Sequence, residues 1–327
     1  MAQHYVFARR AVRFAVALLF AAAAAFEAAG QQLPVFSIYR DQWNAINPAA
    51  FSNNYLVNQK QATVSATYRR QWWNIDEGPQ TQVLNAEWIS KAKNIALGGH
   101  VINDRAGKLG QTGAYAHYAY RMELGRRTAQ TLSVGLAAGV VQYRARISDI
   151  RFPDPSGVPA LEDRVIYPDF SLGIFYHYAD RFYVGLSVPQ VFGLSPAFSA
   201  DGQTLAVQRK PHVYAVIGKY FDSWLGNSTS FVEPSLWLKY VPGAPLNADL
   251  NVRMQISDLF WGGVGSGLGF GETTSWTMRL EAGMVLGEQV QIRNAQWKIG
   301  LGYDWPVAPS PLTQLGSALE AHLVFSW

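Results

Sequence analysis

The amino-acid sequence predicts an all-β fold, a transmembrane antiparallel β-barrel of about 14 strands. Three observations carry this prediction. Apolar and polar residues alternate along most of the chain, the composition is poor in charge and rich in aromatic residues, and the first 30 residues resemble a secretory signal. The chain therefore divides into a signal peptide (1–30), an N-terminal segment before the barrel (31–60) and the outer-membrane barrel (61–327).

The first 30 residues have the layout of a secretory signal peptide. Three arginines lie within residues 9–13, an apolar run covers 14–26, and Ala28-Ala29-Gly30 offers small residues for cleavage before Gln31. The apolar run is shorter than the roughly 20 residues that a transmembrane helix needs. We expect export, cleavage and an integral position in the bacterial outer membrane.

The composition favours a barrel and excludes several other classes. Charged residues make up 15% of the chain, against about 25% in soluble domains. The sequence has no cysteine, which excludes disulfides, cysteine zinc clusters and thiol catalysis. Without the signal peptide, 24 basic and 22 acidic residues remain of the 27 and 23 in the whole chain. This near balance gives no reason to expect a nucleic-acid partner.

The last nine residues, 319–327, alternate between two faces of a predicted strand and end on an aromatic residue. One face carries Leu319, Ala321, Leu323, Phe325 and Trp327, and the other carries Glu320, His322, Val324 and Ser326. Outer-membrane barrels have an apolar outer face, a polar lumen face and aromatic residues at the membrane interface. Phe325 and Trp327 are therefore the candidate signal for barrel assembly.

The same period of two recurs along the mature chain, most regularly over 246–257, and places charges such as Arg253 in the lumen. With both termini periplasmic, the long connections 146–167, 191–209 and 306–315 become extracellular. The predicted strands cover 61–72, 80–90, 94–104, 112–124, 130–145, 168–179, 181–190, 210–221, 229–241, 245–257, 259–271, 274–286, 290–305 and 316–327.

Glycine occupies every second position from Gly263 to Gly271, which leaves one face of a strand without side chains. The spacing does not match a phosphate-binding G-x-G-x-x-G loop. Two explanations stay open: strong local curvature, or a groove for a plug or partner segment.

The sequence predicts no catalytic residue, cofactor or metal site. His100, His117, His177, His212 and His322 lie on different predicted strands, and no H-x-x-x-H or H-E-x-x-H pair occurs. The carboxylates of the loop 146–167 lack EF-hand spacing. A serine, histidine and aspartate from separate strands could still assemble in the fold.

A barrel of this size has a lumen too wide for side chains alone to fill. The segment from Gln31 to Gln59, rich in aromatic residues, asparagine and proline, is the candidate to occupy it or to form a periplasmic arm.

Short motifs in this segment and in the barrel resemble the PorP/SprF family of type IX secretion system outer-membrane proteins. In order they are Phe36-Ser37-x-Tyr39, Ile46-Asn47-Pro48-Ala49, Arg70-Gln71-Trp72, Gly78-Pro79-Gln80-Thr81, Asn103-Asp104-x-x-Gly107, Tyr118-Ala119-Tyr120, Leu132-Ser133-x-Gly135 and Tyr183-Val184-Gly185-Leu186-Ser187. Asp41 and Trp73 depart from the family pattern, which leaves the subfamily open.

The resemblance implies a non-enzymatic component of type IX protein secretion or gliding motility in Bacteroidota-type cells. Its implied partners are outer-membrane lipid, a periplasmic lipoprotein ring and a cargo adhesin with a C-terminal sorting domain. Phe36, Ser37, Tyr39, Asn47 and Pro48 are the candidate residues for a partner or plug contact. Whether the protein is a core component or serves one cargo is open, as are its partner surface and oligomeric state.

Two other functions remain as alternatives. A porin-like solute channel would have an open, charge-lined lumen, and a barrel hydrolase would bring serine, histidine and aspartate within hydrogen-bond distance.

The mature protein should begin at Gln31, because the small-residue site at 28–30 directly follows the apolar run. Mass analysis of the N-terminal peptide from isolated outer membranes tests this expectation. A membrane-inserted form that retains Met1 would contradict it.

Overall fold

The computed structural model describes residue 33 and residues 36–50, 60–90, 94–125, 130–146, 162–179, 181–195, 197–200, 203–206, 209–222, 230–271, 274–287, 294–307 and 311–327. The expected signal peptide and its cleavage site lie outside these residues. No helix in the described part of the chain has the length and apolar composition that a membrane crossing requires.

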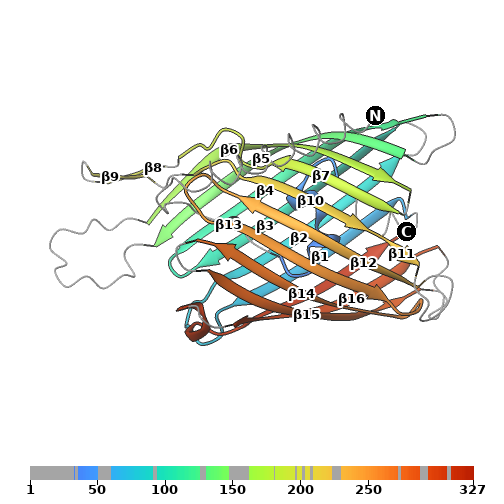
Figure 1. Cartoon of the computed structure of the whole chain (residues 1–327). Coiled ribbons are helices and arrows are strands. Elements are labelled where there is room, and N and C mark those ends of the chain that lie inside the picture. Colours follow the sequence, from blue (N-terminus) through green and yellow to red (C-terminus); the bar gives the residue numbers. More distant parts are fainter. Residues whose placement is uncertain are drawn as a thin grey trace, which may run out of the picture.

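Most described residues belong to one antiparallel sheet (Figure 1). Its strands are β1 (Ala62–Gln71), β2 (Gln80–Ser90), β3 (Ile95–Ala106), β4 (Leu109–Glu123), β5 (Gln130–Arg146), β6 (Glu162–Tyr178), β7 (Phe182–Val188), β10 (Val213–Lys219), β11 (Phe221–Asp222), β12 (Phe231–Tyr240), β13 (Leu246–Gln255), β14 (Phe260–Phe270), β15 (Ser275–Leu286), β16 (Gln296–Val307) and β17 (Ala318–Ser326). The remaining elements are the hairpin β8 (Ala197–Ala200) with β9 (Gln203–Ala206), and the short helices η1 (Tyr39–Asp41), α2 (Trp43–Ile46) and η5 (Pro311–Gln314).

The sheet closes on itself, because β1 pairs with β17 and β10 pairs with β12. Every strand of this 15-stranded sheet except the two-residue β11 takes part in the ring, so the predicted count of about 14 strands is confirmed. Closure leaves no unpaired edge, which a sheet inside a membrane must avoid. At the seam, the backbone N–H of Trp327 donates to Ala62 O at 2.9 Å, and Trp327 O accepts from Gln61 and Ala62 at 3.0 Å.

The two ends of the barrel differ. The longest connections, β5 to β6 and β7 to β10, lie at one end, which we call the loop end. At the opposite, terminal end the chain enters β1 and leaves β17 (Figure 1). With periplasmic termini, the loop end faces the cell exterior.

Side chains alternate between the two faces of the wall, as the sequence predicted. Leu319 and Leu323 of β17 and the following Trp327 are 37%, 41% and 49% exposed on the outside, whereas Glu320 and Ser326 are fully buried in the lumen. Arg253 of β13 also lies in the lumen and is 2% exposed.

The sequence prediction was wrong about where β6 begins. The strand begins at Glu162, whereas the alternation indicated residue 168. The charges and prolines in the predicted loop 146–167 concealed the alternation of the first residues of the strand. Residues 162–167 pair with 141–146 of β5, so this hairpin extends further toward the loop end. Residues 147–161 lie outside the described residues.

The glycine strip of β14 faces the lumen, and polar side chains from both neighbouring strands lie across it. A Cβ built on Gly263 would lie 2.5 Å from Oε1 of Glu281, and one on Gly265 would collide with the Asn251 carboxamide. Among the described residues, the close approach is thus made by side chains of the barrel itself, whereas the groove hypothesis expected the backbone of a plug or partner segment.

Replacing Trp327 by serine should lower the amount of protein in the outer membrane several-fold. The inserted fraction should stay folded, because the seam is held by backbone hydrogen bonds while the indole is half exposed at the outer face. Quantitative immunoblots of outer membranes give the level, and resistance to unfolding in warm detergent gives the fold. Equal levels of both forms would contradict an assembly role.

Candidate functional site

Residues 36–50, which we call the plug, lie inside the barrel and precede its first strand. Figure 1 shows this segment within the ring of strands. η1 and α2 form two short turns, and every plug residue except Ala45 is buried. So short a helix is not stable alone in water. The contacts with the wall therefore determine the conformation of the plug.

Aromatic side chains form the centre of the plug. Trp43 meets the rings of Tyr39, Phe175 and Tyr183 at centroid distances of 5.5, 5.7 and 5.3 Å, and Tyr39 lies 5.0 Å from Trp237. Trp43 and Tyr39 are completely buried. Pairs at these separations add about 0.5 to 1.5 kcal/mol each to the gain from burial. The lumen thus contains an apolar core that joins the plug to β6, β7 and β12.

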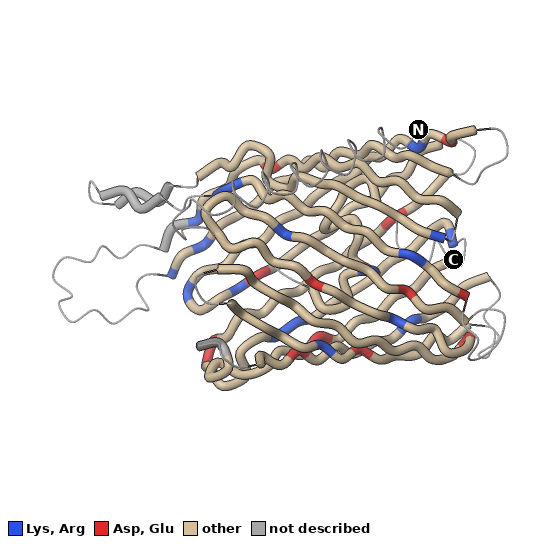
Figure 2. The backbone as a smooth tube through the Cα atoms, in the orientation of Figure 1, with Lys and Arg blue, Asp and Glu red and all other residues tan. Residues whose placement is uncertain are grey.

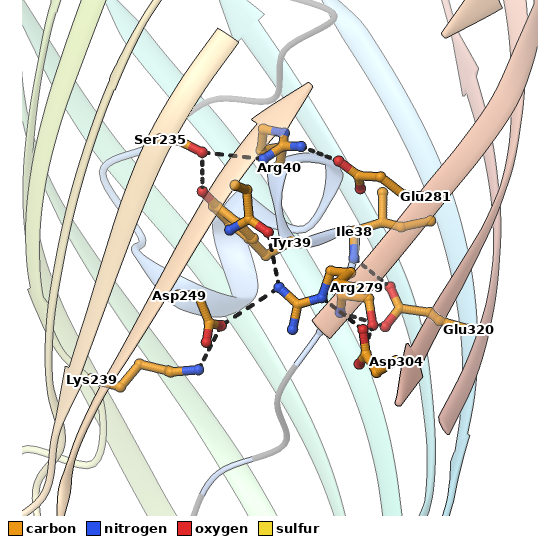
Figure 3. Close-up of polar contacts among 12 residues, drawn as sticks. Ile38, Tyr39, Arg40, Ser235, Lys239, Asp249, Arg279, Glu281, Asp304 and Glu320 are labelled. Atoms are coloured by element: carbon orange, nitrogen blue, oxygen red, sulfur yellow. Dashed lines mark hydrogen bonds and ion pairs between the residues drawn. The ribbon is translucent and has the colours of Figure 1, made fainter. Parts of the chain in front are cut away.

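Arg40 extends from η1 to an acidic part of the wall (Figure 3). Its guanidinium forms an ion pair with Glu281 of β15 and lies 3.5 Å from Glu233 of β12. It also donates to Ser235 Oγ at 3.2 Å, and this hydroxyl lies 2.6 Å from the Tyr39 hydroxyl. Two carboxylates from separate strands thus surround one buried cation.

Asp41, the next residue, extends to a basic part of the wall. Its Oδ2 lies 2.5 Å from Lys298 Nζ on β16, 3.4 Å from His322 Nε2 on β17 and 3.8 Å from Arg253 Nη1 on β13. The carboxylate is fully buried. A buried charge is tolerated only when it is paired in this way.

A third set of contacts fixes the backbone before η1 (Figure 3). The N–H groups of Ser37 and Ile38 donate to the two carboxylate oxygens of Glu320 at 2.7 and 2.9 Å. The Ser37 hydroxyl donates to Asp304 at 2.7 Å and accepts from Arg69. Arg69 in turn lies 2.6 Å from Asp304 and 3.3 Å from Glu320. The wall therefore supplies partners for backbone donors that the plug cannot satisfy internally.

Asn47 and Pro48 lie against a part of the wall that has no side chains. A Cβ on Gly135 would lie 2.5 Å from the Pro48 carbonyl carbon, and one on Gly173 would collide with Asn47 Oδ1. Asn47 Nδ2 donates to the carbonyl of Ile174 at 3.1 Å and to that of Leu186 at 3.3 Å. These glycines let the plug backbone approach the sheet closely.

The plug crosses the lumen from the loop end toward the terminal end. The Leu33 N–H donates to Nε2 of His212, which precedes β10 at the loop end. Pro48 lies beside Gly135, six residues into β5 from the terminal end. The next described residue after the plug, Lys60, leads into β1 at that terminal end. The amino-terminal side of the plug therefore faces the loop end.

Cavities remain on the loop side of the plug. One of about 290 Å³ is lined by Leu33, Arg69, Lys239, Asp249 and Arg279, among others. Lys239 and Arg279 reach Asp249 at 2.7 and 3.7 Å, and Arg279 also reaches Asp304 at 2.8 Å. The described lumen is thus partly filled, and this cavity is lined by charge pairs.

The histidines do not form a reactive centre in the described residues. The rings of His100 and His117 share a hydrogen bond of 2.8 Å, and no cluster of three metal-ligating side chains occurs in this part of the chain. His322 lies between Asp41 and the Thr67 hydroxyl, at 2.8 Å from the latter. Thr67 is 4% exposed and also accepts from Gln42, so a substrate has no access to this hydroxyl in the plugged barrel.

The residues singled out from the sequence fall into two places. Phe36, Ser37, Tyr39, Asn47 and Pro48 come together in the plug, while Phe325 and Trp327 lie on the outer face at the terminal end. Sequence reasoning missed Arg40 and Asp41 and their partners on β12 to β17. Two adjacent opposite charges inside an aromatic segment were the available signal, but their partners lie about 190 to 280 residues away in the chain.

Replacing Asp41 by asparagine should lower the free energy of unfolding by about 3 to 5 kcal/mol, because Lys298 and Arg253 stay buried without their carboxylate. Urea unfolding of the refolded protein in detergent, followed by tryptophan fluorescence, measures this loss. The exposed carboxylate Glu77 provides the control, and Glu77→Gln should unfold like the unchanged protein. An unchanged midpoint for Asp41→Asn would show that the ion pairs of Asp41 contribute nothing to stability.

Comparisons with known proteins agree with this architecture. The monoaromatic hydrocarbon channel CymD has a TM-score of 0.53 at 12% identity, over 89% of this chain and 92% of that chain. A FadL homologue from Pseudomonas aeruginosa has a TM-score of 0.49 at 10% identity, over 91% and 98%. At such identities the likeness to CymD shows the fold alone. A search of curated protein sequences finds no match.

The family comparison is more specific. The model described as "Type IX secretion system membrane protein PorP/SprF" matches residues 28–323, which include the plug and almost the whole barrel. This confirms the resemblance that the short motifs indicated. The chain belongs to the PorP/SprF family of type IX secretion system membrane proteins.

Proposed function

We propose that this protein is a non-enzymatic outer-membrane platform for type IX secretion or gliding. In this proposal the barrel anchors the protein in the membrane, and the segment 31–59 closes the lumen and engages a partner. The partner is either a secreted adhesin with a C-terminal sorting domain or the periplasmic lipoprotein ring. Family membership supports the secretion role.

The observation that carries the proposal is the way in which the plug is built into the wall. Its polar contacts reach β2, β6 and β7 on one side and β12, β15, β16 and β17 on the other. A porin-like channel for polar solutes would need a continuous polar path, whereas aromatic rings fill the centre of this lumen. A plugged barrel suits a surface on which other proteins assemble.

In this proposal the plug contacts its periplasmic partner at the terminal end of the barrel. Asn47, Pro48 and Ala49 form its last buried contacts with β5 to β7, ten or more residues before β1. A change that loosens these contacts alters how the following segment is presented, while the hydrogen-bonded ladder of the barrel is left intact. Export should therefore be sensitive to Asn47 and Pro48, and barrel insertion should not.

Replacing both Asn47 and Pro48 by alanine should reduce surface display of proteins with type IX sorting domains several-fold in a deletion strain carrying the variant. The two hydrogen bonds of the Asn47 amide, each worth about 1 kcal/mol, are lost. Surface proteomics measures display, and immunoblots of outer membranes control for insertion. Asn74→Ala, in an exposed turn at the loop end, is the matched control.

A substitution in the barrel wall distinguishes the platform function from the channel function. Gly173→Val places a side chain where Asn47 now lies and should reduce export as the plug variant does. Conductance in planar bilayers should be low for the unchanged protein and higher for Gly173→Val. Normal export in the deletion strain, together with loss of uptake of a small solute, would overturn the platform in favour of a channel.

A further inference from the structure

The cavity of about 290 Å³ lies at the loop end, on the exterior side of the plug. Its rim is formed by residues at strand ends, such as Gln71 of β1, Asn247 of β13 and Ser275 of β15, which are partly exposed. Its deeper part includes Asp249 and Arg279, which are 3% and 4% exposed. The cavity therefore descends from the mouth of the barrel toward the plug. Its volume is near the lower limit of ligand pockets, about 300 Å³.

The floor of the cavity is the loop-end part of the glycine strip of β14, with Gly267 and Gly269. Polar residues of β13 and β15 flank these two glycines in the register: Asn247, Asp249, Ser275 and Thr277. A Cβ built on Gly267 would lie 3.0 Å from Asp249 Oδ1 and 3.8 Å from the Cβ of Thr277. A strand without side chains lets a ligand approach its backbone closely. Polar groups then stand on both sides of that ligand.

The charged side chains of the cavity hold one another in place (Figure 3). Lys239 donates to Asp249 Oδ2 at 2.7 Å, and Arg279 donates through Nε to Asp304 at 2.8 Å and through Nη1 to Asn251 at 3.1 Å. Among the described residues, no hydrogen bond reaches Asp249 Oδ1 or Arg279 Nη2. An acceptor and a donor, both fixed by their neighbours, thus have hydrogen-bonding capacity left for a ligand.

The charges of the cavity favour a neutral ligand. Each of its three cations already has a carboxylate partner, since Arg69 lies 2.6 Å and Arg279 2.8 Å from Asp304, and Lys239 lies 2.7 Å from Asp249. Figure 2 shows the same mixture of basic and acidic segments along the lower part of the barrel, where β13 to β16 lie. An anionic ligand would have to compete with these carboxylates for the cations.

Neighbouring hydroxyl groups avoid this competition, because each hydroxyl both donates and accepts. One hydroxyl can donate to Asp249 Oδ1 while another accepts from Arg279 Nη2, and the existing ion pairs stay intact. Leu33, Val241 and Pro245 add apolar surface to the lining. A sugar ring has hydroxyl groups around its edge and C–H groups on its faces, so it uses both kinds of surface.

We propose that this cavity binds one neutral sugar ring that reaches the barrel from the cell exterior. Asp249 and Arg279 hold ring hydroxyls in the deeper part of the cavity, Thr277 contacts a hydroxyl nearer the mouth, and the ring lies over Gly267. Because the barrel wall separates the cavity from the membrane, the sugar is the free end of a glycan. Its source is a surface polysaccharide or a secreted glycoprotein. This binding site is independent of the proposed role in secretion.

Saturation-transfer NMR of the mature full-length protein in an amine-oxide detergent, which contains no sugar, tests the proposal. The probes are the methyl glycosides of glucose, galactose, mannose and N-acetylglucosamine. At least one of them should bind with a dissociation constant in the millimolar range or below. Inorganic phosphate and glycine at millimolar concentration should not displace it, because the cations of the cavity are already paired.

Two variants of the cavity should weaken binding. Gly267→Val fills the floor and should lower the affinity about tenfold or more. Thr277→Val keeps the shape but removes a hydroxyl, and should lower the affinity several-fold, as expected for one hydrogen bond. The matched control is Gly262→Val on the outward face of the same strand, where a Cβ meets only the Glu281 carbonyl oxygen at 3.5 Å. It should bind like the unchanged protein, and resistance to unfolding in warm detergent shows that each variant is folded.

Two competitors distinguish the sources of the sugar: delipidated surface polysaccharide from the same cells, and glycopeptides from their secreted proteins. Three results would each overturn the proposal. The first is the absence of saturation transfer to all four glycosides. The second is unchanged affinity in both folded cavity variants, or an equal loss in Gly262→Val. The third is displacement of the sugar by phosphate or glycine.

Discussion

The structure depends on the pairing of two adjacent opposite charges in the plug with two separate parts of the barrel wall. Arg40 meets Glu281 and Glu233, and Asp41 meets Lys298 and its basic neighbours. Neither charge could stay inside the lumen alone, because removing an ion from water costs several kcal/mol. The pair therefore fixes the rotation and depth of the plug, and the aromatic contacts follow from that position.

The two halves of the wall hold the plug by different means. The half from β12 to β17 supplies charged side chains, whereas β5 to β7 offer glycines and backbone carbonyls that accept from Asn47. Charge pairs tolerate small shifts, but a backbone packed on glycine does not. This difference makes the contact of Asn47 and Pro48 the more specific one. The proposed role of the plug in export rests on that geometry.

The outer surface shows a second asymmetry, between the strands β3 to β6 and the rest of the barrel. There the hairpin of β5 and β6 extends toward the loop end and carries Arg144 and Arg164 on its outer face. The plug lies inside the lumen and the exposed Arg164 of β6 lies outside, so the two features use opposite faces of the same wall. A barrel wall only one residue thick can carry both, because successive side chains point to opposite faces.

The sequence by itself determined the period of two along the strands, the count of about 14 strands, the lumen face of charges such as Arg253 and the family, because these depend on local alternation and short motifs. It pointed to the plug residues Phe36, Ser37, Tyr39, Asn47 and Pro48, but it did not show that they lie together inside the barrel. It also set the start of β6 six residues too late. Only the tertiary structure decided that Asp41 meets Lys298 and that Pro48 lies on Gly135, since these contacts join residues about 90 to 260 positions apart. Closure of the barrel brings them together, and local sequence carries no signal for the angle at which a segment settles inside a closed sheet.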